Sequence, residues 1–280
     1  MQKRRWLIVV LVLTTLFGVG YLGVCAAVYK YQDKLLFFPD DYFAQDPSSA
    51  GLSVEEFEVE VEPGSTITGW ISEIDPAAPW VLHFHGNGGN ISHRIDHLLL
   101  FKQLGFNGVV FDYRGYGKSK GTPSEAGLVA DGHAMVKYLT EERGVNEQRL
   151  VYFGESLGGG VAAAVSETEP PRALILKSTF TSVPDMAAEL YPFLPARMLS
   201  KTEFSTKDRV PKFLFPKLVI HSRVDTIIPF AHGQRLYQLC GEPKAFLELH
   251  RDHNTSPLDL GEDFKRAVHD LVQESVPKDW

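Results

Sequence analysis

The chain has 280 residues, of which 44% are hydrophobic and 22% are charged, and its formal net charge at pH 7 is −7. This length and composition predict one or two globular domains rather than a disordered chain. Residues 1–30 hold four basic and no acidic residues, so the remainder has 24 basic against 35 acidic residues and a formal charge of −11. Such an acidic domain is a poor binder of nucleic acid.

The first predicted element is an uncharged stretch of 24 residues from Trp6 to Tyr29. As a helix it would be about 36 Å long, enough to cross the roughly 30 Å hydrocarbon core of a bilayer. A cleaved signal peptide has a shorter apolar stretch and a small-residue cleavage site, and the residues before Cys25 fit a lipid-modified cysteine badly. We therefore expect residues 1–30 to be an uncleaved transmembrane anchor and residues 31–280 to form the main domain.

The basic residues around this span predict its orientation. Residues 3–5 are Lys-Arg-Arg, whereas the lysines after the span are diluted by aspartates. The positive-inside rule then places the N-terminus in the cytoplasm and the main domain outside it. Glycosylation sequons at Asn90 and Asn254 would carry bulky glycans beside the motifs described below. This favours a bacterial inner membrane, with the domain facing the periplasm, over a eukaryotic secretory route.

The segment after the span, YKYQDKLLFFPDDYF, suits the membrane interface, a packing arm against the domain, or both. Beyond it, short apolar runs alternate with helical stretches, which predicts a mostly parallel, eight-stranded sheet with helices on both faces and two antiparallel strands at one edge. We expect strands at residues 54–61, 67–72, 80–84, 108–111, 150–153, 173–176, 217–220 and 245–249. We expect helices at about residues 92–104, 124–142, 156–167, 229–240 and 260–275.

Residues 179–216 break this alternation, because they are rich in Pro, Phe and Leu and lack a clear strand. We interpret them as a small cap over the functional edge of the sheet, and an irregular crossover is the alternative.

Four features follow predicted strands, at the edge where sites form in such sheets. The first is GESLG, in which glycines two residues to either side of Ser156 permit a sharp turn that exposes the serine oxygen; an incidental serine in a glycine-rich loop is the alternative. The others are HGNGGN at residues 85–90, Asp225 and His253. A serine becomes nucleophilic when a base accepts its proton and an acid orients that base. The chain order Ser, Asp, His is the order of one particular fold.

The motifs GESLG, HGNGGN, HSRVDTIIP and HRDHN resemble those of the α/β-hydrolase superfamily. The stretch FDYRGYGKSKGTPSEAGLVADG further resembles a membrane-anchored branch that includes protein depalmitoylases, lysophosphatidylserine lipases and bacterial relatives. The resemblance extends from about Gln32 to the predicted C-terminal helix. It implies an α/β-hydrolase fold preceded by one transmembrane helix.

The resemblance also implies roles for individual residues. Ser156 matches the nucleophile, Asp225 the acid and His253 the base. The backbone N–H groups of Asn87 and Leu157 match the oxyanion hole, which stabilises negative charge on the attacked carbonyl oxygen. The side chain of Asn87 could serve only to shape its loop.

Several other polar residues compete for a role near this edge. His250 is the less suitable base, because the family places an asparagine directly after the catalytic histidine, as in His253-Asn254. Asp252 is badly placed to orient its neighbour His253. We expect Glu155, His83, Asp112, Arg114 and Tyr116 to be structural, and we leave open whether His221 lines the site.

These residues predict a membrane-anchored serine hydrolase that cleaves an ester or thioester of an acyl lipid or acylated protein through an acyl-enzyme. A serine peptidase and a non-catalytic binding protein on the same scaffold are the alternatives. We expect no cofactor and no metal. The expected partners are the ester substrate and the bilayer, the latter contacted through residues 6–29.

Overall fold

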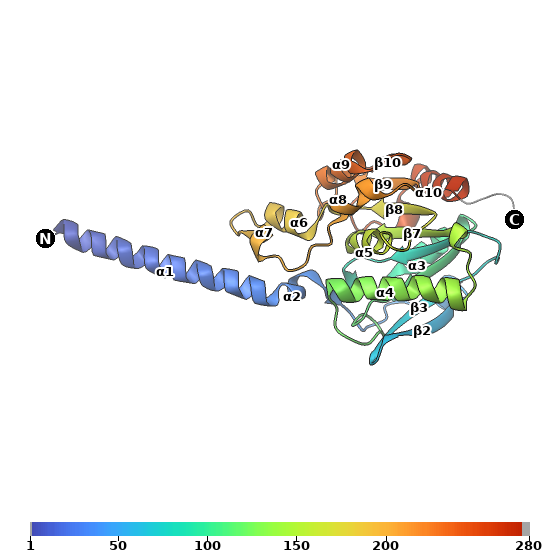
Figure 1. Ribbon diagram of the computed structural model, residues 1–280, viewed down its shortest axis with the longest axis horizontal. Coiled ribbons are helices and arrows are strands. Elements are labelled where there is room, and N and C mark those ends of the chain that lie inside the picture. Colours follow the sequence, from blue (N-terminus) through green and yellow to red (C-terminus); the bar gives the residue numbers. More distant parts are fainter. Residues whose placement is uncertain (1, 276–280) are drawn as a thin grey trace.

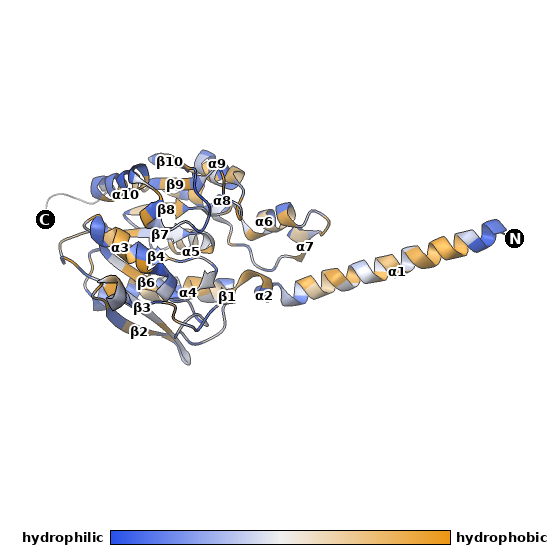
Figure 2. Cartoon of the chain, turned by 180° about the vertical axis from the view of Figure 1, so that it is seen from behind, coloured by the Kyte–Doolittle hydropathy of each residue, from blue (hydrophilic) through white to orange (hydrophobic). Residues whose placement is uncertain are grey.

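The structure is a computed structural model, and it describes residues 2–275. Figure 1 shows a long helix, α1 (Gln2–Tyr31), that projects from one end of an α/β domain. Figure 2 shows apolar residues along most of this helix and a polar N-terminal tip. A helix that is apolar all round and not buried by protein suits a lipid environment. α1 is therefore a candidate for a single membrane span, as the sequence predicts.

Within the described residues, eight strands form one sheet in the order β10-β9-β8-β7-β4-β6-β3-β2. The strands β2 and β3 pair antiparallel, as do β3 and β6, and the other neighbours are parallel. The predicted fold class is confirmed, and every predicted strand lies within two residues of the observed bounds. These are β2 (Glu55–Glu62), β3 (Ser65–Ser72), β4 (Trp80–Phe84), β6 (Asn107–Phe111), β7 (Leu150–Glu155), β8 (Ala173–Lys177), β9 (Lys217–Ser222) and β10 (Lys244–Leu249).

Helices cover both faces of this sheet. Consecutive residues of a strand point to opposite faces of the sheet. In β4, Leu82 belongs to the core under α4 (Glu125–Lys137) and α5 (Leu157–Val165). Its neighbour Val81 belongs to the core under α3 (Ile95–Gln103) and α10 (Glu262–Ser275) on the other face. The helix α9 (Phe230–Leu239) joins the first face through Leu236. Burial on both faces explains why the central strands are continuous apolar runs.

Residues 179–216 contain several short helices joined by irregular segments, which favours the cap interpretation. They contain α6 (Val183–Leu190), α7 (Ala196–Leu199) and α8 (Thr206–Arg209), followed by a 3₁₀ turn at Val210–Lys212, and no residue in this segment is assigned to a strand. In Figures 1 and 2, α6 and α7 lie beside the end of α1 that meets the domain.

The segment after α1 packs onto the domain as an arm. It contains the short helix α2 (Asp33–Leu36) and the two-residue strand β1 (Phe38–Pro39), which pairs in parallel with β5 (Gly88–Gly89). Between them Phe37 is buried in the main core. The arm therefore reaches the glycine-rich loop at residues 85–90, a pairing that the sequence did not predict.

Candidate active site

Ser156 lies in a strained turn between β7 and α5, with φ 54° and ψ −121°. A positive φ is uncommon for a residue with a side chain and costs conformational energy. The flanking glycines are required by close backbone packing: a Cβ on Gly158 would overlap the carbonyl oxygen of Phe84, and one on Gly154 would lie 2.6 Å from the Cα of Gly159. The sharp turn predicted at GESLG is therefore present.

Asp225 and His253 form a direct hydrogen bond after the neighbouring strands β9 and β10. The imidazole Nδ1 of His253 lies 2.7 Å from Oδ2 of Asp225, and Oδ1 of Asp225 accepts the N–H groups of Ile227 and Ile228 at 2.9 and 2.8 Å. Burial alone would raise the pKa of Asp225, but these hydrogen bonds lower it overall. An ionised Asp225 fixes the proton of His253 on Nδ1, which leaves Nε2 as a proton acceptor.

Ser156 lies at the same carboxyl edge of the sheet, because β7, β9 and β10 run parallel. Ser156 and His253 are 9% and 6% exposed, so both are largely screened from solvent. Among the described residues, His253 is hydrogen-bonded to Asp225 and not to Ser156. Bonds of this kind often tighten only when substrate is bound. The geometry thus supplies an oriented imidazole and a serine in a strained turn on one edge of the sheet.

The other candidates at this edge are placed differently. The His250 side chain is 68% exposed and pairs with Glu248, so its geometry disfavours it as the base. Asp252 accepts a hydrogen bond from the hydroxyl of Thr226. His221 is buried with its Nε2 2.9 Å from the carbonyl of Ile228 and 3.6 Å from Asp225, so it packs behind the acid. Burial lowers the pKa of His221.

Two backbone N–H groups are predicted to form the oxyanion hole. Leu157 is the first residue of α5, where an N–H has no partner within the helix. The N–H groups of Leu157 and Asn87 have no hydrogen-bond acceptor among the described residues. A Cβ on Gly86 would lie 3.4 Å from the Cβ of Ser156, so the loop that carries Asn87 lies against the serine.

The arm after α1 holds this loop in place. The side-chain amide of Asn87 donates to the carbonyl of Leu36 at 3.0 Å, and its backbone carbonyl accepts the N–H of Phe38 and the hydroxyl of Tyr116, each at 2.9 Å. Asn90 donates to two further carbonyls of the arm. The Asn87 side chain therefore shapes the loop, as the sequence suggested.

The residues expected to be structural form the base of the site. Asp112 is fully buried and accepts the N–H of Ile91 at 2.9 Å, and burial raises its pKa to about 8. Arg114 pairs with the buried carboxylate of Asp131 at 2.8 Å. The first contact joins the residue after the loop at 85–90 to the end of β6, and the second joins the segment after β6 to the helix α4.

A buried polar cluster lies next to the turn at Ser156. Glu155 forms an ion pair with Lys177, and His97 and His83 place their Nε2 atoms 3.3 and 3.8 Å from the same carboxylate. Burial and His97 lower the pKa of His83 to about 3. Sequence reasoning missed Lys177 and His97. The one signal for Lys177 was a lysine directly after a buried apolar strand.

Three members of this cluster could in principle hold a metal ion, because His83, His97 and Glu155 bring ligand atoms within 4.8 Å of one another. Lys177 already supplies positive charge to the Glu155 carboxylate. A divalent cation beside a buried ammonium group would meet uncompensated repulsion. We therefore interpret the cluster as a buried ion pair that supports the turn.

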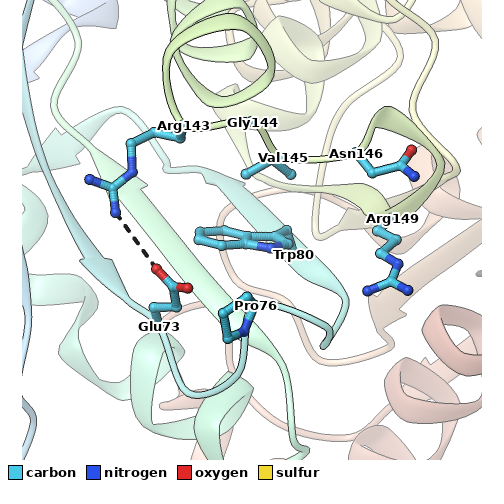
Figure 3. A pocket seen from close by; sticks show the side chains of 8 residues that line it. All are labelled: Glu73, Pro76, Trp80, Arg143, Gly144, Val145, Asn146 and Arg149. Carbon is cyan, nitrogen blue, oxygen red and sulfur yellow. Dashed lines mark ion pairs between the residues drawn. The ribbon is translucent and has the colours of Figure 1, made fainter. Parts of the chain in front are cut away.

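A polar pocket of about 300 Å³ lies at the opposite edge of the sheet, around the first residue of β4, Trp80 (Figure 3). Arg143 and Glu73 form an ion pair of 3.6 Å across it. None of the predicted site residues lines this pocket. It is therefore separate from the candidate active site.

The sheet order, the strained serine turn and the Asp225–His253 pair define an α/β-hydrolase fold. A family model described as "Serine aminopeptidase, S33" matches residues 75–207. Protein bem46 of Schizosaccharomyces pombe is 31% identical over 276 residues, which cover 93% of this chain and 90% of bem46. Protein Rv2307c of Mycobacterium tuberculosis is 35% identical over 80% of this chain and 81% of its own length.

A solved structure has a similar fold. The esterase Pf2001 of Pyrococcus furiosus superposes with a TM-score of 0.70 at 20% identity, over 85% of this chain and 97% of the esterase. The chain therefore belongs to the α/β-hydrolase superfamily, in the branch that contains bem46. By that membership it is a hydrolase.

Proposed function

We propose that the protein is a membrane-anchored serine hydrolase that cleaves carboxylic esters or thioesters of acyl lipids or acylated proteins. The observation that carries this proposal is the hydrogen bond between Asp225 and His253, on the same sheet edge as Ser156 in its strained turn. A binding protein on this scaffold would need neither the strained serine nor the oriented imidazole. The structural neighbour from Pyrococcus furiosus is an esterase, which is consistent with ester chemistry.

The reaction would proceed in two acyl transfers. Oγ of Ser156 attacks the carbonyl carbon while Nε2 of His253 takes its proton, and the N–H groups of Asn87 and Leu157 stabilise the oxyanion. Collapse of this intermediate breaks the bond to the alcohol or thiol, which leaves with the proton from His253. Water, deprotonated by His253, then attacks the acyl-enzyme and releases the acid and a free Ser156.

The anchor makes lipid-borne substrates the preferred class. The helix α1 would hold the site beside the bilayer, where acyl lipids and acylated proteins are concentrated. We infer from the three basic residues at positions 3–5 that the N-terminus is cytoplasmic. We infer that the domain faces the periplasm of a bacterial envelope, because glycans at Asn90 and Asn254 would obstruct the proposed site.

A serine peptidase is the second candidate, favoured by the description of the matching family model. Two chromogenic substrates, each assayed with the full chain in detergent, distinguish the two candidate functions. A p-nitrophenyl ester reports ester cleavage, and an aminoacyl p-nitroanilide reports aminopeptidase cleavage. We expect the ester to be cleaved, and Ser156→Ala to lower that rate on the order of 10³-fold or more.

Ser53→Ala is a matched control, because Ser53 is exposed and remote from the predicted site residues. It should retain the full ester rate. Faster cleavage of the anilide would replace the esterase assignment with a peptidase. Ester hydrolysis that survives Ser156→Ala would overturn the serine mechanism.

A further inference from the structure

An apolar pocket lies between the end of the anchor and the cap. Its lining includes Val28, Leu35 and Leu36 from the anchor side and Met186, Leu190 and Leu194 from the cap side. The cavity is about 170 Å³. An apolar cavity of about 150 Å³ is large enough to bind benzene, so this one has room for an alkyl segment of similar size.

The inner end of the pocket adjoins the candidate active site on two sides. Phe180 lines it, and the preceding Thr179 donates its hydroxyl to the carbonyl of Ser156 at 2.6 Å. On the other side, the carbonyl of Leu36 accepts the side-chain amide of Asn87. An alkyl chain lying in the pocket would therefore be separated by one residue, Thr179 or Leu36, from the turn at Ser156 and from the predicted oxyanion loop.

The outer wall of the pocket is held together by polar contacts between the anchor and the cap. Gln32 donates to the carbonyl of Leu199 at 3.1 Å and accepts the N–H of Lys201 at 2.7 Å. Further up the span, the hydroxyl of Tyr21 donates to the carbonyl of Phe193 at 2.9 Å. Tyr21 lies ten residues before the end of α1, about 15 Å along the helix. If α1 spans a bilayer, the tip of the cap lies at the depth of Tyr21.

The tip of the cap is apolar where it is exposed. We define the cap tip as Leu190, Tyr191, Phe193 and Met198, which are 52%, 47%, 67% and 85% exposed. Soluble domains seldom leave such large side chains together in water, and contiguous exposed apolar surface marks an interaction site. The cap tip lies beside α1, because the hydroxyl of Tyr21 donates to the carbonyl of Phe193, and we therefore expect the same medium to cover both.

We propose that this pocket binds the acyl chain of the substrate and that the chain enters it sideways from the bilayer, with the last turns of the anchor forming one wall. This inference rests on the proposed function. The cap tip is embedded in the leaflet beside α1. The alkyl chain of a lipid ester moves between the cap tip and the anchor, and its carbonyl group reaches Ser156. The anchor is then part of the substrate site and not only a tether.

Filling the pocket from either wall tests its role as the acyl site. The two variants are Val28→Trp on the anchor and Ala187→Trp on the cap, both at residues that line the pocket. The full chain in detergent micelles is assayed with p-nitrophenyl acetate and p-nitrophenyl octanoate. We expect acetate hydrolysis within about twofold of the wild type and octanoate hydrolysis lowered at least tenfold in each variant.

Val9→Trp is the matched control, because Val9 is an exposed residue of the same helix far from the cap. It should match the wild type on both esters. Labelling of Ser156 by a fluorophosphonate shows that each variant is folded. Octanoate rates at the wild-type level in both folded variants would overturn the pocket assignment. Failure of the wild type to cleave either ester would instead overturn the proposed function.

The route from the bilayer is tested by charges on the cap tip. Phe193→Asp and Met198→Asp are assayed on acetate in solution and on an octanoyl ester of a lipid in phosphatidylcholine vesicles. We expect unchanged acetate rates and at least fivefold slower vesicle hydrolysis, because a buried carboxylate is expelled from hydrocarbon. Leu214→Asp, at a position that is 86% exposed and outside the pocket lining, should leave both rates unchanged. Vesicle rates equal to the wild type in both cap-tip variants would overturn the bilayer route.

Discussion

The side-chain amide of Asn87 donates to the backbone carbonyl of Leu36, 3.0 Å away. This bond joins the predicted oxyanion loop to the arm that follows α1. Because the backbone carbonyl of Asn87 also accepts the N–H of Phe38, the arm holds the residue whose N–H is proposed to form part of the oxyanion hole. The segment that follows α1 and the candidate active site are thus in direct contact.

Removing this bond should slow the chemical step. We expect Asn87→Ala to lower kcat on a soluble ester about tenfold and to change KM little, because one hydrogen bond of about 1–1.5 kcal/mol positions the N–H group. Steady-state kinetics on p-nitrophenyl butyrate separate kcat from KM. Asn146→Ala, which removes a cap from a 3₁₀ turn remote from the site, is the control. An unchanged kcat for Asn87→Ala would mean that the loop holds its shape without the arm.

The arm should matter more for chemistry on small esters than the membrane span does. A chain that begins at Tyr31 keeps Leu36 and Phe38, and we expect it to hydrolyse small soluble esters at nearly the full rate. A chain that begins at Tyr42 lacks both contacts with Asn87 and should lose most of that activity. Circular dichroism on both chains checks that they fold. Equal activity of the two folded chains would contradict a positioning role for the arm.

Substitutions of His253 and His250 should have very different effects on the rate of ester hydrolysis. We expect His253→Ala to reduce ester hydrolysis on the order of 10³-fold or more, because its Nε2 is the predicted proton acceptor. His250→Ala should stay within about twofold of the wild type, since the His250 side chain is 68% exposed and pairs only with Glu248 among the described residues. Asp225→Asn should fall between them, because it disturbs the tautomer of His253 without removing the base. A reversal of the two histidine variants would show that the histidine loop has been misassigned.

The buried carboxyl group of Asp112 should make stability fall with rising pH. Burial raises its pKa from an ordinary 3.8 to about 8, so folding favours the protonated form. Its stabilising contribution is complete below about pH 4 and is lost as the pH rises toward 8. Asp112→Asn imitates the protonated form, so the stability of this variant relative to the wild type should increase from pH 5 to pH 8.

Urea unfolding of the full chain in detergent, at both pH values, measures this difference. Asp263→Asn is the control, because the Asp263 side chain is 84% exposed on α10. A difference between Asp112→Asn and wild type that is the same at pH 5 and pH 8 would contradict the burial argument.

The strands of the sheet could be predicted from the sequence because each one is a local apolar run. The turn at Ser156 could be predicted because only glycine fits at Gly154 and Gly158, where backbone atoms pack closely. The Asp225 and His253 positions followed from their places after parallel strands, whose carboxyl ends share an edge. The family pattern of an asparagine directly after the histidine favoured His253 over His250. In these cases the information lies within a few residues of the feature itself.

The features that sequence reasoning missed depend on contacts between distant segments. The pairing of β1 with β5 involves only two residues on each side, too few to produce a periodic pattern. The bond between Tyr21 and Phe193 joins residues 172 positions apart, and nothing near either residue indicates the other. The ion pair between Lys177 and Glu155 likewise depends on the pairing of β7 with β8, which brings the two residues opposite each other.

Ser156 is proposed to be the nucleophile of a serine hydrolase. The most direct measurement of this role is fluorophosphonate labelling of the full chain in detergent, followed by peptide mass spectrometry. We predict one label per chain, on Ser156, with matching loss of ester hydrolysis and no label on Ser156→Ala. A label on another residue, or a fully active enzyme that the probe does not modify, would contradict the account.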